Sequence, residues 1–188
     1  MKIVLMRHGK PLIDKHLRLN ASEFGIWVER YNAAGIDAQC PPPPIAIEQV
    51  NQCSMTVCSD LPRSVESARA LGVERVGLTD HMFREMDMPH AAWRFPKISL
   101  LVWLVFFRLA WAFGYSSNVE SFKAAKERAH DCAEYLVRLA STHHAVLFVG
   151  HGSLNWFIAK YLKNMGWLSS KMAPRRYWEF SVFLSRNK

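Results

Sequence analysis

The sequence contains few cysteines, and their spacing suits neither a metal site nor a redox centre. Only four of the 188 residues are cysteines, and no two form a C-x-x-C pair; they are Cys40, Cys53, Cys58 and Cys132. Structural zinc sites and thioredoxin-like centres depend on such pairs. We therefore expect reduced thiols that serve mainly in packing, as is usual for cytoplasmic proteins.

No apolar run is long enough for a comfortable membrane span. A spanning helix needs about 20 apolar residues. The longest stretch here, Ile98 to Phe113, has sixteen residues, of which Ser99 and Arg108 are polar. Only four apolar residues separate Lys2 from Arg7, too few for the apolar region of a secretory signal. We therefore predict a cytoplasmic protein.

The sequence also lacks a basic run interleaved with aromatic residues. Platforms that bind nucleic acids combine these two features, so we expect no nucleic-acid partner. The 24 Lys and Arg residues nevertheless exceed the 16 Asp and Glu residues, which gives a formal net charge of +8. A positive field of this size attracts anions of some kind.

What the sequence does contain is an alternation of strand and helix signals. Its length suits one domain, 1–188, with a sizeable core. Bounded apolar runs predict strands from Ile3 onward and over 55–58, 73–78, 145–149 and 177–184, the last at a sheet edge. Helices are expected over 21–31, 45–52, 61–71, 98–113, 118–140 and 153–162. The fold class that follows is a three-layer α/β/α sandwich with a mostly parallel central sheet.

Residues that can cap helices mark several of these helix starts. The expected caps are Asn20 or Ser22, Ser59 with Asp60, Ser117 or Asn118, and Ser153. The proline run Pro41–Pro44 must be extended. It is interpreted as a surface crossing and not as a domain boundary, because residues expected to cooperate lie on both sides of it.

The apolar segment has two interpretations. As a helix it places Trp103, Phe107 and Trp111 on one stripe. It is then either a buried or dimer-facing helix, or an apolar lid or membrane-surface contact beside the active site. We treat it as an apolar helical insertion at about 97–114.

Three strand ends carry side chains that bind anions. The first strand ends in Arg7-His8-Gly9, a later strand ends in Gly150-His151-Gly152, and Arg63 lies in the first turn of a helix that follows a strand. In open α/β sheets, ligands bind at the carboxyl ends of the strands. One guanidinium group can donate to two phosphate oxygens at once. These residues therefore predict one phosphate site. The arginines beside the histidines would oppose a metal ion, so we expect neither metal nor cofactor.

The ordered motifs resemble the histidine phosphatase superfamily, with its phosphoglycerate mutase-like fold. The resemblance depends on Arg7-His8-Gly9, the S-x-L-x-R-S stretch Ser59–Ser64, Glu85 within Arg84–Asp87, and Gly150-His151-Gly152. It implies that His8 is the nucleophile and forms a phosphohistidine. It also implies that Arg7, Arg63, His151 and Gly152 bind the phosphoryl group.

The resemblance further implies that Glu85 is the proton donor, with Asp87 as the fallback. The alternative for Glu85 is an exposed carboxylate paired with Arg84. The chain departs from the family at Pro11 and Asp14, where relatives often carry threonine and asparagine. A carboxylate at that position would repel phosphate, so Asp14 is expected to point elsewhere.

The leading functional prediction is a metal-independent phosphomonoesterase of the histidine acid phosphatase type, acting on a small-molecule phosphate ester. The apolar segment lies where relatives tend to carry insertions that determine the substrate, which suggests an amphiphilic substrate such as a lipid or prenyl phosphate. Two alternatives stay open. One is a mutase-type phosphotransferase, and the other is a non-catalytic module that binds phosphate or a phosphoprotein.

Overall fold

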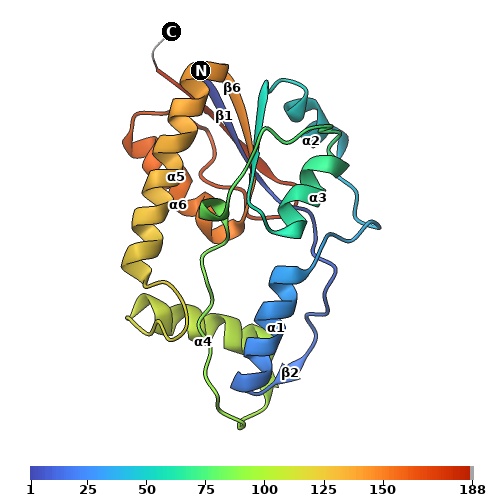
Figure 1. Cartoon of the computed structure of the whole chain (residues 1–188), viewed down its shortest axis with the longest axis vertical. Coiled ribbons are helices and arrows are strands. Elements are labelled where there is room, and N and C mark those ends of the chain that lie inside the picture. The colour runs from blue at the N-terminus through green and yellow to red at the C-terminus, as the bar shows by residue number, and fades with distance from the viewer. Residues whose placement is uncertain (187–188) are drawn as a thin grey trace.

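The computed structural model describes residues 1–186, and a five-stranded sheet lies at its centre (Figure 1). The strands in spatial order are β4 (Leu78–Thr79), β3 (Met55–Cys58), β6 (Ala145–Gly150), β1 (Lys2–Arg7) and β7 (Phe180–Leu184). The first four are mutually parallel, and β7 lies antiparallel to β1 at the edge. The prediction of a mostly parallel sheet is confirmed.

Helices cover both faces of the sheet. One face packs against α5 (Phe122–His143) and α6 (Gly152–Asn164), and the other against α2 (Pro44–Val50) and α3 (Pro62–Ala70). Successive residues of a strand point to opposite faces. Ile3 and Leu5 accordingly join the α5/α6 side, whereas Val4 and Met6 join the α2/α3 side. This explains why β1 is apolar at consecutive positions, and it confirms the three-layer sandwich.

A third apolar cluster lies beyond the carboxyl end of β1, at the bottom of Figure 1. It consists of α1 (Ala21–Ala33), α4 (Leu100–Ala112) and the antiparallel pair β2 (Arg18–Leu19) and β5 (Ile98–Ser99). We call this group the accessory layer. The rings of Phe24 and Phe107 stack inside it with centroids 5.2 Å apart.

The apolar helix α4 starts two residues later than predicted, because Ile98 and Ser99 pair with β2 as strand β5.

The strand predicted over 73–78 is mostly wrong. Only Leu78 and Thr79 join the sheet as β4, and the short 3-10 helix η1 (His81–Phe83) follows. Gly72 adopts a φ of +88°, and the amide of Val73 donates to the carbonyl of Ala68 at 3.0 Å. This contact closes the C-terminus of α3. Val73 therefore belongs to the helix end and is not free to extend the strand.

Three of the predicted caps are also wrong, those of α3, α5 and α6. Leu61 is the N-cap of α3 and makes no side-chain cap bond, because a leucine side chain has no acceptor; Pro62 occupies the first turn. Ser59 and Asp60 instead bind His151 and Arg84. Helix α5 begins at Phe122, and its cap is Ser121, not Ser117 or Asn118. By contrast, Asn20 caps α1 in a capping box with Glu23, as the sequence indicates. Within residues 1–186, no helix has the length and hydropathy needed to cross a bilayer.

Candidate active site

The two strand ends that the sequence singles out are neighbours in space. Strands β1 and β6 pair in parallel, with Arg7 opposite Gly150. The residues that follow therefore leave the sheet together, and the rings of His8 and His151 lie with centroids 5.1 Å apart. Both side chains are buried. The sheet register thus builds the centre of the site.

His8 has one ring nitrogen engaged and the other available. Its Nδ1 lies 2.7 Å from the carbonyl oxygen of Gly9. A carbonyl can only accept, so Nδ1 carries the proton and Nε2 carries the lone pair. Burial and, next, the Arg63 guanidinium lower the pKa of His8 from 6.5 to about 3. The imidazole is therefore neutral near pH 7, as a nucleophile requires.

His151 is held from one side only. Its Nε2 shares a hydrogen bond of 2.7 Å with the Ser59 hydroxyl. Its backbone, not the predicted Ser153 side chain, occupies the N-cap of α6. Burial, and then the positive charges around it, hold the pKa of His151 well below its usual range. Its Nδ1 is buried and has no hydrogen-bond partner among residues 1–186.

Arg63 and Arg7 also each have a buried nitrogen without a hydrogen-bond partner in the described chain. Arg63 is fully buried; it donates to the carbonyl of Tyr31 at 2.8 Å and stacks over the Tyr31 ring at 4.4 Å. Arg7 donates to the carbonyl of Arg175 and lies 4.7 Å over the ring of Tyr177. The buried Nε of each guanidinium lacks a partner in the described chain. Together with His151, these atoms fit an anion that has several acceptor oxygens.

The Arg7 side chain lies close to the backbone of Gly152. A Cβ at residue 152 would lie 3.3 Å from Cζ of Arg7, a tight contact. The guanidinium therefore passes close over the first residue of α6. The free amides at the N-terminus of this helix also favour negative charge at the same place.

Glu85 is bound to the N-terminus of α6. Its two carboxylate oxygens accept from the amides of Ser153 at 3.2 Å and Leu154 at 3.0 Å. Arg84 pairs with Asp60 at 2.6 Å, so the alternative that paired Glu85 with Arg84 is wrong. Glu85 therefore stands next to Gly152 and Arg7, at the edge of the crevice.

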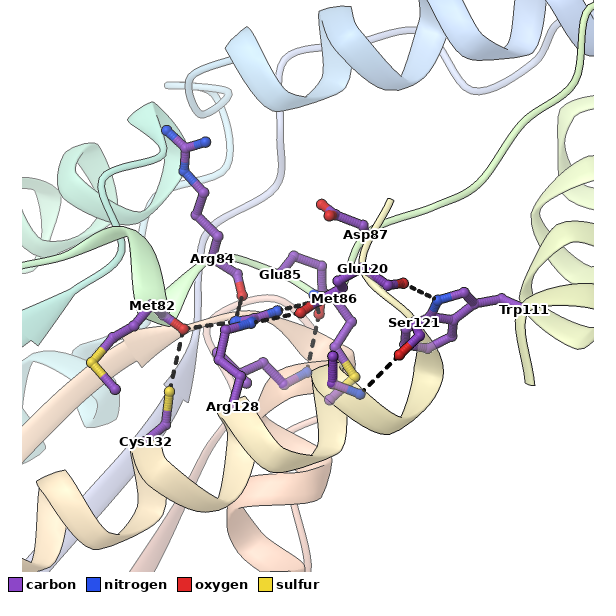
Figure 2. A network of polar contacts seen from close by, with 12 residues as sticks. Met82, Arg84, Glu85, Met86, Asp87, Trp111, Glu120, Ser121, Arg128 and Cys132 are labelled. Carbon is purple, nitrogen blue, oxygen red and sulfur yellow. Dashed lines mark hydrogen bonds and ion pairs between the residues drawn. The ribbon is translucent and has the colours of Figure 1, made fainter. Parts of the chain in front are cut away.

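The loop that carries Glu85 is held by a network that the sequence did not reveal (Figure 2). Arg128 on α5 donates to the carbonyls of Met82 at 2.6 Å and Arg84 at 2.9 Å. It is oriented by an ion pair with Glu120, whose own carbonyl accepts from Nε1 of Trp111 on α4 at 2.8 Å. Helices α4 and α5 are thereby tied to the loop that carries Glu85.

Two pockets open beside Arg7 and Glu85. The larger, of about 510 Å³, lies toward α4 and α6, and the smaller, of about 220 Å³, lies toward α1. Arg7, Glu85, Met86 and Arg108 line both. The two pockets therefore flank the same carboxylate and the same guanidinium.

The smaller pocket is lined by Asp87, the fallback donor, and by two residues that sequence reasoning missed. Burial and the nearby Glu120 raise the pKa of Asp87. The two missed residues are Lys15 and Tyr177, which are hydrogen-bonded to each other. The Tyr177 ring lies 5.7 Å from the His8 ring.

Asp14 lies outside both pockets. It is exposed, and its Oδ1 accepts from the amide of His16 at 2.8 Å. This is the orientation that the charge argument predicts. Among the described residues, the group whose side chains lie close enough to hold a metal ion is His130, Asp131 and Glu134 on α5. It shares no residue with the crevice.

The sequence matches the family model of the histidine phosphatase superfamily (branch 1) over residues 46–181. The chain belongs to this superfamily. The matched region includes Arg63, Glu85 and His151 but begins after Arg7 and His8. The β1–β6 pairing brings those two residues beside His151, so the candidate site is assembled by the fold and not by one continuous motif.

Solved structures support the histidine phosphatase fold. The product of open reading frame Rv3214 from Mycobacterium tuberculosis aligns over 96% of this chain and 89% of that chain, with a TM-score of 0.63 and 14% identity. YhfR of Bacillus stearothermophilus aligns over 98% and 95%, with a TM-score of 0.61 and 14% identity. A mycobacterial glucosyl-3-phosphoglycerate phosphatase in complex with VO3 aligns over 96% and 91%, with a TM-score of 0.60 and 17% identity. No curated protein matches the sequence significantly.

Proposed function

We propose that the protein is a metal-independent phosphomonoesterase that works through a phosphohistidine on His8. The observation that carries this proposal is the free lone pair on Nε2 of His8. The lone pair is free because Nδ1 is committed to the carbonyl of Gly9, and the ring is neutral because it is buried beside Arg63. A neutral imidazole with an available nitrogen is the form that can attack phosphorus.

The first step transfers the phosphoryl group to the enzyme. The phosphoryl oxygens bind Nε of Arg7, Nε of Arg63 and Nδ1 of His151, three buried atoms that have no other partner in the described chain. Nε2 of His8 then bonds to phosphorus, and the bond from phosphorus to the ester oxygen breaks. Glu85 in its acid form gives its proton to the departing oxygen. The amides of Ser153 and Leu154 stabilise the carboxylate that remains.

The second step releases phosphate. A water molecule attacks the phosphohistidine and gives one proton to the Glu85 carboxylate, and the bond between phosphorus and Nε2 of His8 breaks. Inorganic phosphate leaves, and both side chains return to their starting forms. The arginines stabilise the charge on the phosphoryl oxygens in both steps with groups that the fold has already positioned.

The larger pocket supports an amphiphilic ester as substrate. It lies beside Arg7 and Glu85, and its walls are mostly apolar; they include Leu109, Trp111 and Phe157. Such walls would remove a hydrocarbon group from water at about 25 cal/mol per Å² of buried surface. The mycobacterial phosphatase of the same fold supports hydrolysis, although 17% identity carries nothing about its substrate over to this chain.

The test is phosphate release from para-nitrophenyl phosphate in the presence of a chelator. Wild type, His8→Ala and the control His16→Ala are compared, because His16 is exposed and outside both pockets. We expect release by wild type and the control, no release by His8→Ala, and an acid-labile phosphoryl group on the peptide that contains His8. Equal release by wild type and His8→Ala would overturn the mechanism.

The same assay separates the two alternatives. A mutase-type phosphotransferase would form the phosphohistidine but release little phosphate until a sugar or glycerate acceptor is added. A non-catalytic module would bind inorganic phosphate, measured by calorimetry, and would form no phosphohistidine with any ester. Either result would replace hydrolysis as the function.

A further inference from the structure

Helix α4 has one buried and one exposed apolar side. Trp103, Phe107 and Trp111 form the buried stripe that the sequence predicts. The opposite side is apolar as well, and we call it the α4 face; its residues and exposed fractions are Leu101 68%, Val102 50%, Val105 53%, Phe106 44%, Leu109 56% and Phe113 90%. A helix that is apolar all round is normally covered on all sides. Here a contiguous apolar surface is left open to solvent, which is typical of an interaction site.

The α4 face continues into the active-site crevice. Leu109 belongs to the face and also lines the larger pocket, together with Ala112 on the next turn. Across the pocket, the half-exposed Trp156 of α6 extends the same apolar surface. Arg7 and Glu85 lie in the wall of this pocket. A molecule seated on the face would therefore lie beside the pocket that Arg7 and Glu85 line.

Positive charge borders this surface. The chain contains no acidic residue between Asp87 and Glu120, whereas exposed Arg94 and Lys97 precede the helix. Lys97 is paired with Glu23 at 2.8 Å, and no ion pair is recorded for Arg94 among residues 1–186.

Further cations lie on the pocket side. Lys126 lies 5.3 Å from the ring of Phe122, and Lys160 lies 5.8 Å from the ring of Trp156; the two rings line the larger pocket. An apolar surface bordered by cations complements the anionic headgroups and acyl chains of a bilayer. A second copy of the chain would instead bring cations against cations.

We propose that the α4 face docks on an anionic membrane surface, with α4 lying in the plane of the lipid interface. The geometry permits this, because α4 lies at the end of the molecule remote from the N-terminus (Figure 1). In this position the larger pocket opens toward the lipids. Docking of this kind does not require the phosphatase activity proposed above, so the two can fail separately.

The experiment is sedimentation of the full chain with phosphatidylcholine vesicles, with and without phosphatidylglycerol. The test variant is Leu101→Gln/Val105→Gln/Phe113→Gln, whose positions lie on the face and line neither pocket. We expect wild type to bind the anionic vesicles more tightly than the neutral ones, and the variant to bind the anionic vesicles at least about tenfold more weakly. Its hydrolysis of a soluble aryl phosphate should equal that of wild type.

The matched control is Leu12→Gln/Ile45→Gln/Leu168→Gln, which makes the same change at residues 69%, 58% and 49% exposed and away from α4. It should bind vesicles as wild type does, and so should His8→Ala. Equal binding by wild type and the α4 variant, or no binding by wild type, would overturn the proposal. A wild-type dimer that the α4 variant converts to a monomer in sedimentation velocity would assign the face to a second copy instead.

Discussion

The buried neutral state of His8 predicts how the stability of the protein depends on pH. The fold lowers the pKa of His8 from 6.5 to about 3, so between these values the unfolded chain binds a proton that the folded chain does not. Stability therefore falls as the pH falls below 6.5. Between there and about pH 4, the loss that follows from this shift is about 3 kcal/mol from this side chain alone.

The assay is urea denaturation of wild type and His8→Gln near neutral pH and at about pH 4. Glutamine removes the titration and keeps a polar side chain of similar length. We expect wild type to lose about 3 kcal/mol more than the variant between the two pH values. His16→Gln controls for the loss of an exposed imidazole and should behave as wild type does. If wild type and His8→Gln lose the same stability, burial does not hold His8 neutral, and the reasoning about its nucleophilicity is refuted.

Three further predictions concern the residues around His8. Arg63→Lys keeps the positive charge but loses the planar guanidinium that donates to several oxygens at once. Steady-state turnover of an aryl phosphate should therefore fall by about 10² to 10³. A decrease of less than threefold would show that Arg63 does not stabilise the phosphoryl group in the reaction. Glu85→Gln should slow hydrolysis of an alkyl phosphate by about 10² to 10⁴, because its leaving oxygen needs a proton. Hydrolysis of para-nitrophenyl phosphate should slow much less, and equal losses for both esters would contradict an acid role. Gly9→Ala would place a Cβ 2.3 Å from the ring of Trp178, so thermal denaturation should show a loss of about 1 to 3 kcal/mol, and adding Trp178→Leu should restore part of it. An unchanged melting temperature would contradict this packing argument.

The centre of the site could be predicted because its residues follow strands. An apolar run at consecutive positions indicates a strand buried on both faces, and in a parallel sheet the ends of such strands meet at one edge. If the two strands are neighbours, that argument brings His8 and His151 to one crevice, and the β1–β6 register of the structure makes them neighbours. The position of Arg63 follows equally from its place in the first turn after β3.

The surroundings of the site could not be predicted in the same way, because they depend on contacts between distant backbone groups. Arg128 holds the loop through the backbone carbonyls of Met82 and Arg84. Every residue has a backbone carbonyl, so the sequence does not show which ones accept from Arg128. Lys15 and Tyr177 lie 162 positions apart and meet only once the fold is formed. The same limit explains the wrong caps. Ser59 has the chemistry of a cap, but its hydroxyl binds His151 instead.

The single arginine of the apolar helix shows how the accessory layer and the catalytic loop depend on each other. Arg108 donates to the carbonyls of Asp87 at 3.0 Å and Met86 at 3.3 Å, and its guanidinium lies 4.9 Å from the ring of Trp111. Met86 is buried, and a buried carbonyl without a partner costs about 1 to 3 kcal/mol, so an apolar residue at position 108 would leave the Met86 carbonyl without its donor. The charge therefore persists inside an otherwise apolar segment because the loop just after Glu85 needs donors from α4. It follows that α4 cannot be treated as a surface addition to the fold. The helix that exposes an apolar face to solvent also fixes the backbone beside the proposed proton donor.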